Sequence, residues 1–298
     1  MTTTQTVLAA LLGSLSLICP MPVFAQSKSI TLTVDDYRPL DAAVLEIEKI
    51  SGLPIHYEDM RCDFAGDELD ITPLIGVTPA QLALHGSVKD VVPRGGPLAA
   101  MIAVDASTGR LLDAEATSEA LNAVVSAYNA PGTLPGQFEV VRANGAFFVE
   151  PTAVRNSSGQ TVPIRAILST PITIPAEERI AADTLNLILA QVSQLSGFKV
   201  SVGEVPMNAL AMTRGAFSAS QEPACQVLGR FLNSLVGYGA VAPSSSPTLA
   251  YRVFYDVQLR YYMFSVVEVG YVGPRYLPTP PAPPSPGPGR PGLNPKNP

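Results

Sequence analysis

The sequence predicts an α+β protein made of two tandem small modules, with an insertion in the first module and a Pro-rich disordered tail. Two observations support this fold class. A strand-helix-strand pattern at residues 29–57 recurs at residues 172–202, and in both places a second helix and two strands follow. The chain has 298 residues, 47% of them apolar, which is enough material for buried cores.

The first copy begins with a half-buried strand, because apolar and polar residues alternate from Ile30 to Val34. Pro39 suits the first turn of a helix, and apolar residues then follow at helical spacing. Gly52 is typical of a left-handed cap, so the helix should end there. Residues 53–57 then return as a strand.

The second copy repeats this order. Residues 172–174 form a short strand that we expect to end at Pro175. A helical apolar pattern covers residues 185–195, and Gly197 occupies the position of the cap. Residues 198–202 are predicted to form the returning strand.

In each copy a stretch without clear helix or strand periodicity follows. A second helix is then predicted, at 118–128 in the first copy and 222–235 in the second. In the first copy the two strands that follow are joined at Asn144-Gly145, a strong signal for a tight hairpin. The strands are expected at 138–142, 146–150, 250–255 and 260–268.

These patterns divide the chain into segments. The Pro-rich tail has 11 Pro in its 25 residues, a composition typical of extended or disordered chain. The predicted segments are a signal peptide at 1–25, a first module at 26–152 with an insertion at about 73–113, a linker at 153–170, a second module at 171–273 and the tail at 274–298.

The N-terminal segment predicts export to the periplasm or secretion. Residues 7–18 form an apolar run that is too short to span a bilayer, and Val23-Phe24-Ala25 fits a cleavage site after Ala25. A retained membrane anchor and a lipoprotein attached at Cys19 are the alternatives. We expect no integral membrane span after cleavage of the signal segment.

Charge is distributed unevenly along the chain. Residues 26–150 carry 8 Lys/Arg and 18 Asp/Glu, for a net charge of −10, and residues 151–298 carry 11 Lys/Arg and 7 Asp/Glu, for a net charge of +4. This balance disfavours nucleic-acid binding. It permits attraction between the halves, or head-to-tail association of neighbouring copies.

Two cysteines remain after the expected cleavage, Cys62 and Cys225. In an oxidising compartment they are candidates for a disulfide that would tie the modules together. The alternative is a pair of buried, unpaired thiols.

Several segments of the modules match the pattern of a known family. They are the strand 30–34, Leu40-Asp41-Ala42-Ala43, Ser51-Gly52-Leu53-Pro54-Ile55, Glu119-Ala120-Leu121 and the hairpin Asn144-Gly145, with Leu185, Leu189 and Val227-Leu228 in the second copy. The whole order resembles the secretin and TonB short N-terminal domain, and the ring-forming N-domains of secretins. The resemblance implies binding or assembly and no catalytic residues. Members of this family usually precede a membrane barrel or pore, whereas this chain continues into the Pro-rich tail.

The sequence contains no recognised catalytic, metal or cofactor motif, and it has only two His. The spacing of His56 and Cys62 allows a catalytic pair, but a plain strand residue is the favoured interpretation of His56. The acidic stretch 58–70 is interpreted as a solvated face, with a cation site as the alternative. We therefore expect no enzymatic activity, no cofactor and no metal.

Aromatic residues alternate with arginines between residues 251 and 264. Such a surface can stack on sugars or peptides, or bind a partner by strand addition. The alternative is a pair of strands covered by helices. The candidate binding residues are Arg252, Phe254, Arg260, Tyr262 and Phe264.

Together these features predict an exported, non-enzymatic adaptor of the bacterial cell envelope. It would bind other envelope proteins or its own copies through sheet edges and protein–protein contacts. Two alternatives stay open: a secreted hydrolase or inhibitor that uses the insertion of the first module, and a glycan- or peptidoglycan-binding module that uses the Tyr/Arg hairpin.

Overall fold

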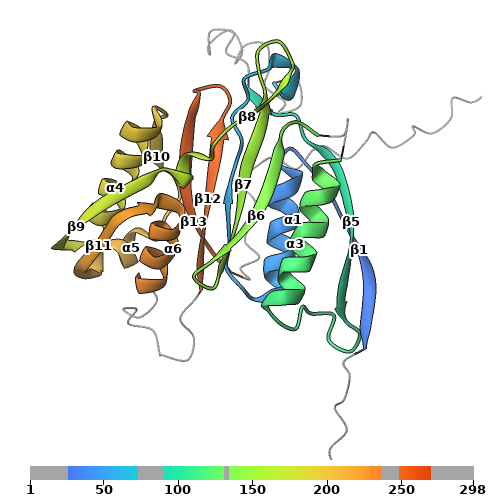
Figure 1. Cartoon of the computed structure of the whole chain (residues 1–298), viewed down its shortest axis with the longest axis horizontal. Helices are drawn as coiled ribbons and strands as arrows, with labels where there is room; N and C mark the ends of the chain where they lie inside the picture. The colour runs from blue at the N-terminus through green and yellow to red at the C-terminus, as the bar shows by residue number, and fades with distance from the viewer. Residues whose placement is uncertain (1–25, 73–89, 131–133, 236–247, 270–298) are drawn as a thin grey trace, which may run out of the picture.

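The computed structural model describes residues 26–72, 90–130, 134–235 and 248–269. It is a mixed α+β fold, which confirms the predicted class. A central sheet has a pair of helices on each face, and a two-stranded sheet lies outside each helix pair (Figure 1). The predicted signal segment 1–25, the tail 274–298 and residues 73–89 of the predicted insertion lie outside the described residues.

The central sheet runs through both halves of the chain. Its strand order is β10-β13-β12-β2-β7-β6, and β8 (Thr161–Pro163) pairs with the end of β7. The strands of the path are β2 (Ile55–Glu58), β6 (Gln137–Ala143), β7 (Ala146–Arg155), β10 (Val200–Val202), β12 (Leu249–Asp256) and β13 (Tyr261–Glu268).

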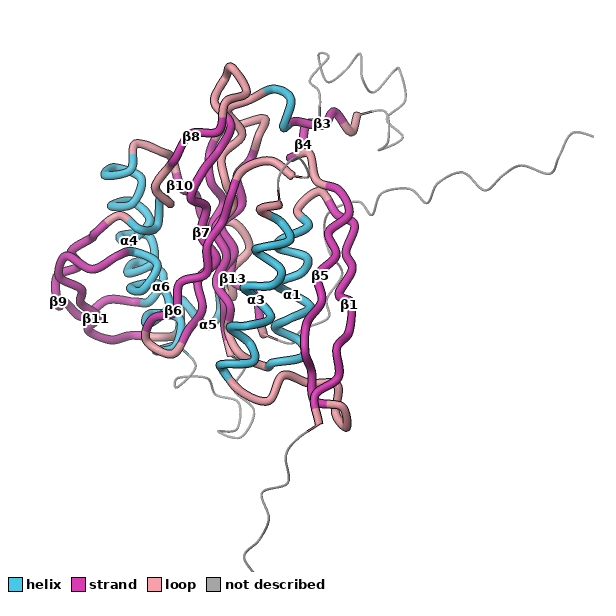
Figure 2. Tube along the Cα trace, turned by 45° about the vertical axis from the view of Figure 1, so that its right-hand side comes forward, coloured by secondary structure: helices cyan, strands magenta, loops and turns pink. Residues whose placement is uncertain are grey.

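The two halves place their helices on opposite faces of this sheet, as Figure 2 shows. In the first half, α1 (Pro39–Ser51) and α3 (Ala114–Tyr128) lie between the central sheet and the pair β1 (Ser27–Asp36) and β5 (Gly96–Asp105). In the second half the corresponding elements are α4 (Ala181–Ser196), α6 (Ala224–Leu235), β9 (Pro171–Ile180) and β11 (Arg214–Pro223).

Shorter elements connect these layers. They are the 3₁₀ turns Ala65–Asp67 and Ile167–Ser169, β3 (Glu68–Asp70), β4 (Val91–Pro93) and α5 (Met207–Met212). None of the helices in the described ranges has both the length and the apolar composition needed to cross a membrane.

Both halves use the same strand pairings. In the first half β2 is parallel to β7, which is antiparallel to β6. In the second half β10 is parallel to β13, which is antiparallel to β12. The outer pairs β1–β5 and β9–β11 are both antiparallel. Apart from the short elements, the order of the strands and helices and their pairing are therefore the same in the two halves.

The local turn chemistry follows the predicted pattern. Helices α1 and α4 end at Gly52 and Gly197, whose φ angles of 70° and 77° lie in the left-handed region that glycine adopts without a Cβ clash. Asn144 and Gly145 have φ angles of 52° and 78° and connect β6 to β7. Positive φ at both residues is what a two-residue hairpin requires.

Three boundaries differ from the expectation. Strand β5 lies inside the predicted insertion 73–113, yet it pairs with β1 along its whole length, so it belongs to the first half. Residues 153–170 are not a free linker, because β8 pairs with β7. The stretch before α6 that has no clear sequence pattern contains α5 and strand β11.

Strand β9 also continues past Pro175, where the sequence predicted its end. The register of β9 against β11 shifts between the pairs Glu177–Phe217 and Ile174–Ala219. An irregularity of this kind accommodates a residue that has no N–H to donate, and among the described strands β9 pairs with β11 alone.

The apolar core is divided by the central sheet into two clusters. One cluster lies under α1 and α3 and includes Tyr57, Phe147 and Val149. The other lies under α4 and α6 and includes Tyr251 and Phe264. Burial of both faces explains why these strands are rich in large apolar residues.

The cap of α4 gives a first test. We expect Gly197→Ala to lower the free energy of unfolding by about 1–2 kcal/mol, because a Cβ is disfavoured at a left-handed φ. No atom lies within 4 Å of the added Cβ, so the effect is conformational and not steric. Urea unfolding measures it.

The matched control is Gly215→Ala on β11, where the added Cβ also meets open space and φ is not positive. This variant should change stability by less than about 0.5 kcal/mol. Equal losses in the two variants would contradict the assignment of Gly197 as a conformational cap.

Candidate functional site

The two halves meet where β12 runs parallel to β2, and we call this junction the seam. The register pairs Arg252 with Tyr57 and Val253 with Glu58. The Asp59 amide donates to the Val253 carbonyl at 2.7 Å, which continues the pairing beyond the end of β2. One strand of the second half thus completes the sheet of the first half.

A buried arginine holds the seam on the side of α1. The Arg252 side chain is 1% exposed, forms an ion pair with Glu48, and has its Nε 2.8 Å from Asp41 Oδ1. Its Nη1 donates to the Ile55 carbonyl at 2.6 Å. Burial raises the pKa of Glu48, and the Arg252 guanidinium opposes that shift. Arg252 therefore connects a strand of the second half to the helix and strand of the first.

A second arginine reinforces the end of the seam. Arg38 Nε donates to Asp59 Oδ2 at 2.8 Å, and Arg38 Nη2 donates to the Tyr255 carbonyl at 2.9 Å. The guanidinium carbon also lies 5.0 Å from the centre of the Phe254 ring. The other carboxylate oxygen of Asp59 accepts a hydrogen bond from the Tyr57 hydroxyl at 3.1 Å.

Glu58 binds the opposite face of the seam to the turn Ile167–Ser169. Its carboxyl oxygens accept hydrogen bonds from the amides of Ile167 at 2.6 Å and Leu168 at 2.9 Å. Burial raises the pKa of Glu58 to about 8, although the two amide hydrogen bonds act to lower it; nearby Glu150 raises it further. The Glu58 side chain is therefore largely protonated at neutral pH.

His56 is a core residue of the seam. Its ring stacks on Tyr251 at 4.3 Å and lies 5.0 Å from the ring of Phe148. The Tyr251 amide donates to His56 Nδ1 at 3.2 Å, and Gly229 of α6 leaves room for the Nε2 side of the ring. Burial, followed by the nearby Arg252 charge, lowers the pKa of His56 to about 3, so the ring is neutral. The interpretation of His56 as a strand residue agrees with this environment.

The two cysteines are free thiols in this structure, and the candidate disulfide between Cys62 and Cys225 is not formed. Their exposed fractions are 1% and 5%, and both pack in the apolar cluster under α4 and α6. Burial raises the pKa of each thiol above its ordinary value. Both side chains therefore pack as small apolar groups and carry little thiolate character.

The predicted binding surface of aromatic and arginine residues is mostly internal, which corrects that prediction. Arg252, Tyr262 and Phe264 are 1%, 1% and 0% exposed, because helices cover the side of the sheet on which each lies. Phe254 is partly buried next to Arg38. Of the five, Arg260 has an exposed side chain, and it donates to the Cys62 carbonyl at 3.1 Å.

The acidic stretch is not a uniformly solvated face either. Glu58, Asp59 and Asp67 are buried, and each has a partner in the fold. Asp67 forms an ion pair with Arg155. Among the described residues no group of His, Cys, Asp and Glu is arranged to hold a metal ion. Much of this acidic charge is used to hold segments of the chain together.

The sheet path ends at β6 on one side and β10 on the other, and these two edges are the candidate binding site. On β6, the Asn129 side chain bonds both the amide and the carbonyl of Phe138, at 2.9 and 2.8 Å. Main-chain groups alternate in direction along a strand, so those of Val140 and Arg142 also face away from β7. Among the described residues no strand pairs with these groups.

The β10 edge has the same kind of arrangement. The carbonyl of Lys199 and the amide of Gly203 bond β13, so the main-chain groups of Val200 and Val202 face outward. Ser193 Oγ accepts the Val200 amide at 2.9 Å, which leaves the groups of Val202 exposed at the edge. The sequence did not predict either edge, because edge positions depend on the pairing of strands far apart in the chain.

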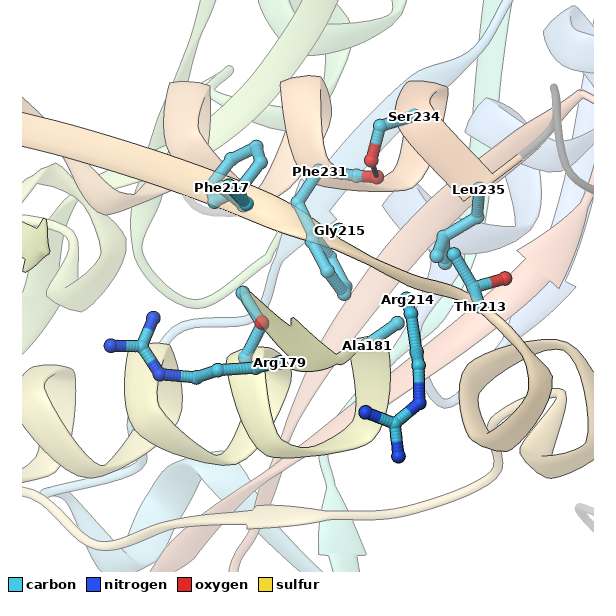
Figure 3. Close-up of a pocket in the computed structure, with 11 residues that line it drawn as sticks. Arg179, Ala181, Thr213, Arg214, Gly215, Phe217, Phe231, Ser234 and Leu235 are labelled. Carbon is cyan, nitrogen blue, oxygen red and sulfur yellow. Dashed lines mark hydrogen bonds between the residues drawn. The ribbon is translucent and has the colours of Figure 1, made fainter. Parts of the chain in front are cut away.

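A small hollow of about 80 Å³ lies between the start of β11 and the end of α6 (Figure 3). Arg179 and Arg214 lie on the side nearer α4, and Phe231, Ser234 and Leu235 come from α6. The Ser234 hydroxyl donates to the Phe231 carbonyl at 2.6 Å. The arginines and apolar floor suit contact with one acidic or apolar side chain, and the volume is well below that of an ordinary ligand pocket.

Comparisons of this chain with protein-family models, with curated proteins and with solved structures found no match.

The seam predicts a large effect of one substitution. We expect Arg252→Met to lower the free energy of unfolding by about 3–5 kcal/mol, because it leaves the Asp41 and Glu48 carboxylates buried without their cation. Urea unfolding measures the loss, and Arg165→Met at an exposed position is the control. A loss below about 1 kcal/mol in Arg252→Met would show that the ion pair does not hold the seam.

The pH dependence of stability follows from Glu58 and His56. The pKa of Glu58 is raised on folding, so its contribution to stability falls as the pH rises from its ordinary value of 4.5 to about 8. The pKa of His56 falls from 6.5 to about 3, so its contribution rises with pH across that window. The two slopes oppose each other between pH 4.5 and 6.5, and of these two groups only Glu58 still contributes a slope above pH 6.5.

We therefore expect a plateau of stability between pH 4.5 and 6.5 and a decline toward pH 8 of at most about 1.4 kcal/mol per pH unit. Urea unfolding at intervals of half a pH unit measures it. Glu58→Gln should remove the decline above pH 6.5, whatever its effect on overall stability. A decline that persists in this variant would assign it to another group.

Proposed function

We propose that this chain is an exported, non-enzymatic binding or assembly protein of the bacterial cell envelope. It would bind other envelope proteins or its own copies through the edges of its central sheet. The observation that carries this proposal is the pair of edges β6 and β10, where outward main-chain groups of Val140, Arg142 and Val202 remain after Asn129 and Ser193 have bonded their neighbours.

An exposed strand edge is a suitable docking element for an extended partner. Main-chain hydrogen bonds supply affinity that does not depend on the partner's sequence, and side chains on alternate positions supply selectivity. On β6, the exposed Glu139 and Arg142 offer charges of both signs to such a partner. This arrangement supports pairing of the edge with the strand of a specific partner, in preference to non-specific apolar contact.

The chemistry of the buried polar residues supports a binding role over a catalytic one. His56 is neutral and packed between aromatic rings, and the two thiols have raised pKa values. Arg252, Asp41 and Glu48 are engaged at the seam. These groups already serve to join the two halves of the chain.

Export is proposed from the sequence, on the apolar run 7–18 and the cleavage pattern at Ala25. The repeated order of elements supports the further proposal that each half is a module similar to the secretin and TonB short N-terminal domain. The glycan-binding alternative loses its aromatic platform, because Tyr262 and Phe264 are buried. Residues 73–89 of the insertion on which the hydrolase or inhibitor alternative rests lie outside the described residues, and β5 of the same insertion is part of the fold.

The test is a capture experiment with edge variants. Val140→Pro and Val202→Pro each remove one outward N–H and leave the hydrogen bonds to β7 and β13 in place. We expect cross-linking in envelope extracts, read by mass spectrometry, to recover a defined partner with the parent chain and at least tenfold less of it with one of these variants.

Met101→Ser on the outer strand β5, where the side chain is 70% exposed, is the control and should retain the partner. Circular dichroism and thermal unfolding check that each variant is folded. Equal recovery of the partner by the folded proline variants and the parent chain would refute binding through these edges.

A further inference from the structure

We propose that the partner of these edges is a second copy of this chain. Copies would join head to tail, with β6 of one copy pairing in parallel with β10 of the next. This inference rests on the proposed function, since it uses the same two edges, and it names their occupant.

The first argument is the relation between the two halves. Along the sheet, β10-β13-β12 and β2-β7-β6 stand in the same order. Strand β12 is parallel to β2 and antiparallel to β13, while β13 is parallel to β10, so β10 runs opposite to its counterpart β2. The helices of the halves also lie on opposite faces. The second half is therefore related to the first by rotation through half a turn about an axis that lies in the sheet and perpendicular to the strands. The rotation is combined with a translation along the sheet by the width of one half.

This relation between the halves determines which kind of strand lies at each open edge of the sheet. The seam joins β12, the counterpart of β6, to β2, the counterpart of β10. The outer edges of the sheet are the same two kinds of edge, and no strand of the described part of the chain pairs with them in a single copy. Repeating the operation that relates the halves therefore brings β6 of one copy against β10 of the next.

The correspondence extends to individual atoms. In the first half the Ile55 amide donates to Glu48 Oε1 of α1 at 2.9 Å. In the second half the Val200 amide donates to Ser193 Oγ of α4 at 2.9 Å. Each helix side chain lies four residues before the capping glycine, and each strand residue lies three residues after it. The first amide of β10 is thus hydrogen-bonded to a side chain of its helix in the same way as the first amide of β2, the strand that pairs with β12 at the seam.

One main-chain contact of the seam can be repeated at the open edges. Register places Arg142 of β6 at the position of Tyr255, whose main-chain amide donates to Asp59 and whose carbonyl accepts from Arg38 at the seam. The counterpart of Asp59 is Glu204, which is exposed and would lie where it can accept the outward main-chain amide of Arg142 from the neighbouring copy. The Arg142 side chain itself lies 3.5 Å from Glu115 of its own copy.

Glu139 stands at the position of Arg252, and it would meet Asn186, whose side-chain amide can donate a hydrogen bond to it. The half that bears β6 carries a net charge of −10 and the half that bears β10 carries +4, which favours the same alignment.

The resulting assembly would be open-ended. A head-to-tail contact is heterologous, and it closes only if the rotation between copies returns to the start. At about 4.8 Å per strand, each copy would add about 29 Å to a continuous sheet of six-strand repeats. The outer contact has no buried arginine like the one at the seam, so we expect weak, reversible association that is sensitive to salt.

The test is sedimentation velocity of the full chain, as the cell processes it, over a concentration series. The parent chain should grow beyond a dimer with rising concentration. Val140→Pro and Val202→Pro should each weaken association at least tenfold, because each removes one outward N–H from β6 or β10 and leaves the pairing within the chain in place. An equimolar mixture of the two variants should form a dimer and grow no further, because the intact β6 of the Val202→Pro chain can pair with the intact β10 of the Val140→Pro chain and the remaining edges cannot.

Arg165→Glu, at an exposed position on neither edge, is the control and should associate like the parent chain. A parent chain that stays monomeric, growth of the parent chain that stops at a dimer, or a mixture of the two variants that stays monomeric would overturn the head-to-tail proposal. The proposed function would survive those outcomes if the capture experiment recovered a different protein through the same edges, so the two failures are distinguishable.

Discussion

The structure depends on the contact of Arg252 with Asp41 and Glu48 at the seam. A guanidinium inside a protein requires anions and hydrogen-bond acceptors around it, and α1 and the Ile55 carbonyl supply both. This requirement sets the position of a C-terminal strand against an N-terminal helix and keeps the sheet continuous. A hydrophobic contact alone would allow β12 to slide along β2, whereas the paired charges define one register.

The sequence predicted local structure well because local signals determine it. Alternation marked β1, and glycines at 52 and 197 ended α1 and α4. Strand β5 was missed, although every second residue from Leu98 to Val104 is buried, because surrounding prolines and glycines suggested an irregular insertion. Strand β9 was cut short at Pro175 because its irregular pairing depends on β11, some 40 residues later.

The candidate site was harder to predict for the same reason. The alternation of Tyr251, Val253 and Tyr255 defines one face of a strand, but it cannot show that helices of both halves cover the two faces. Arg252 therefore resembled an exposed binding residue in the sequence. The open edges could not be predicted from the sequence either. Asn129 and Ser193 form hydrogen bonds with the main chain of the edge strands only when their helices are packed beside the sheet.

The seam joins segments that are far apart in the chain: β2 ends at Glu58 and β12 begins at Leu249. A chain that emerges N-terminus first therefore carries β2 with one side unpaired until nearly all of the protein has been made. Contacts of such long sequence separation form slowly, and an incomplete sheet is prone to pairing with the wrong strand. The nascent first half would consequently depend on a holding factor, or on rapid synthesis of its C-terminal partner, to avoid aggregation.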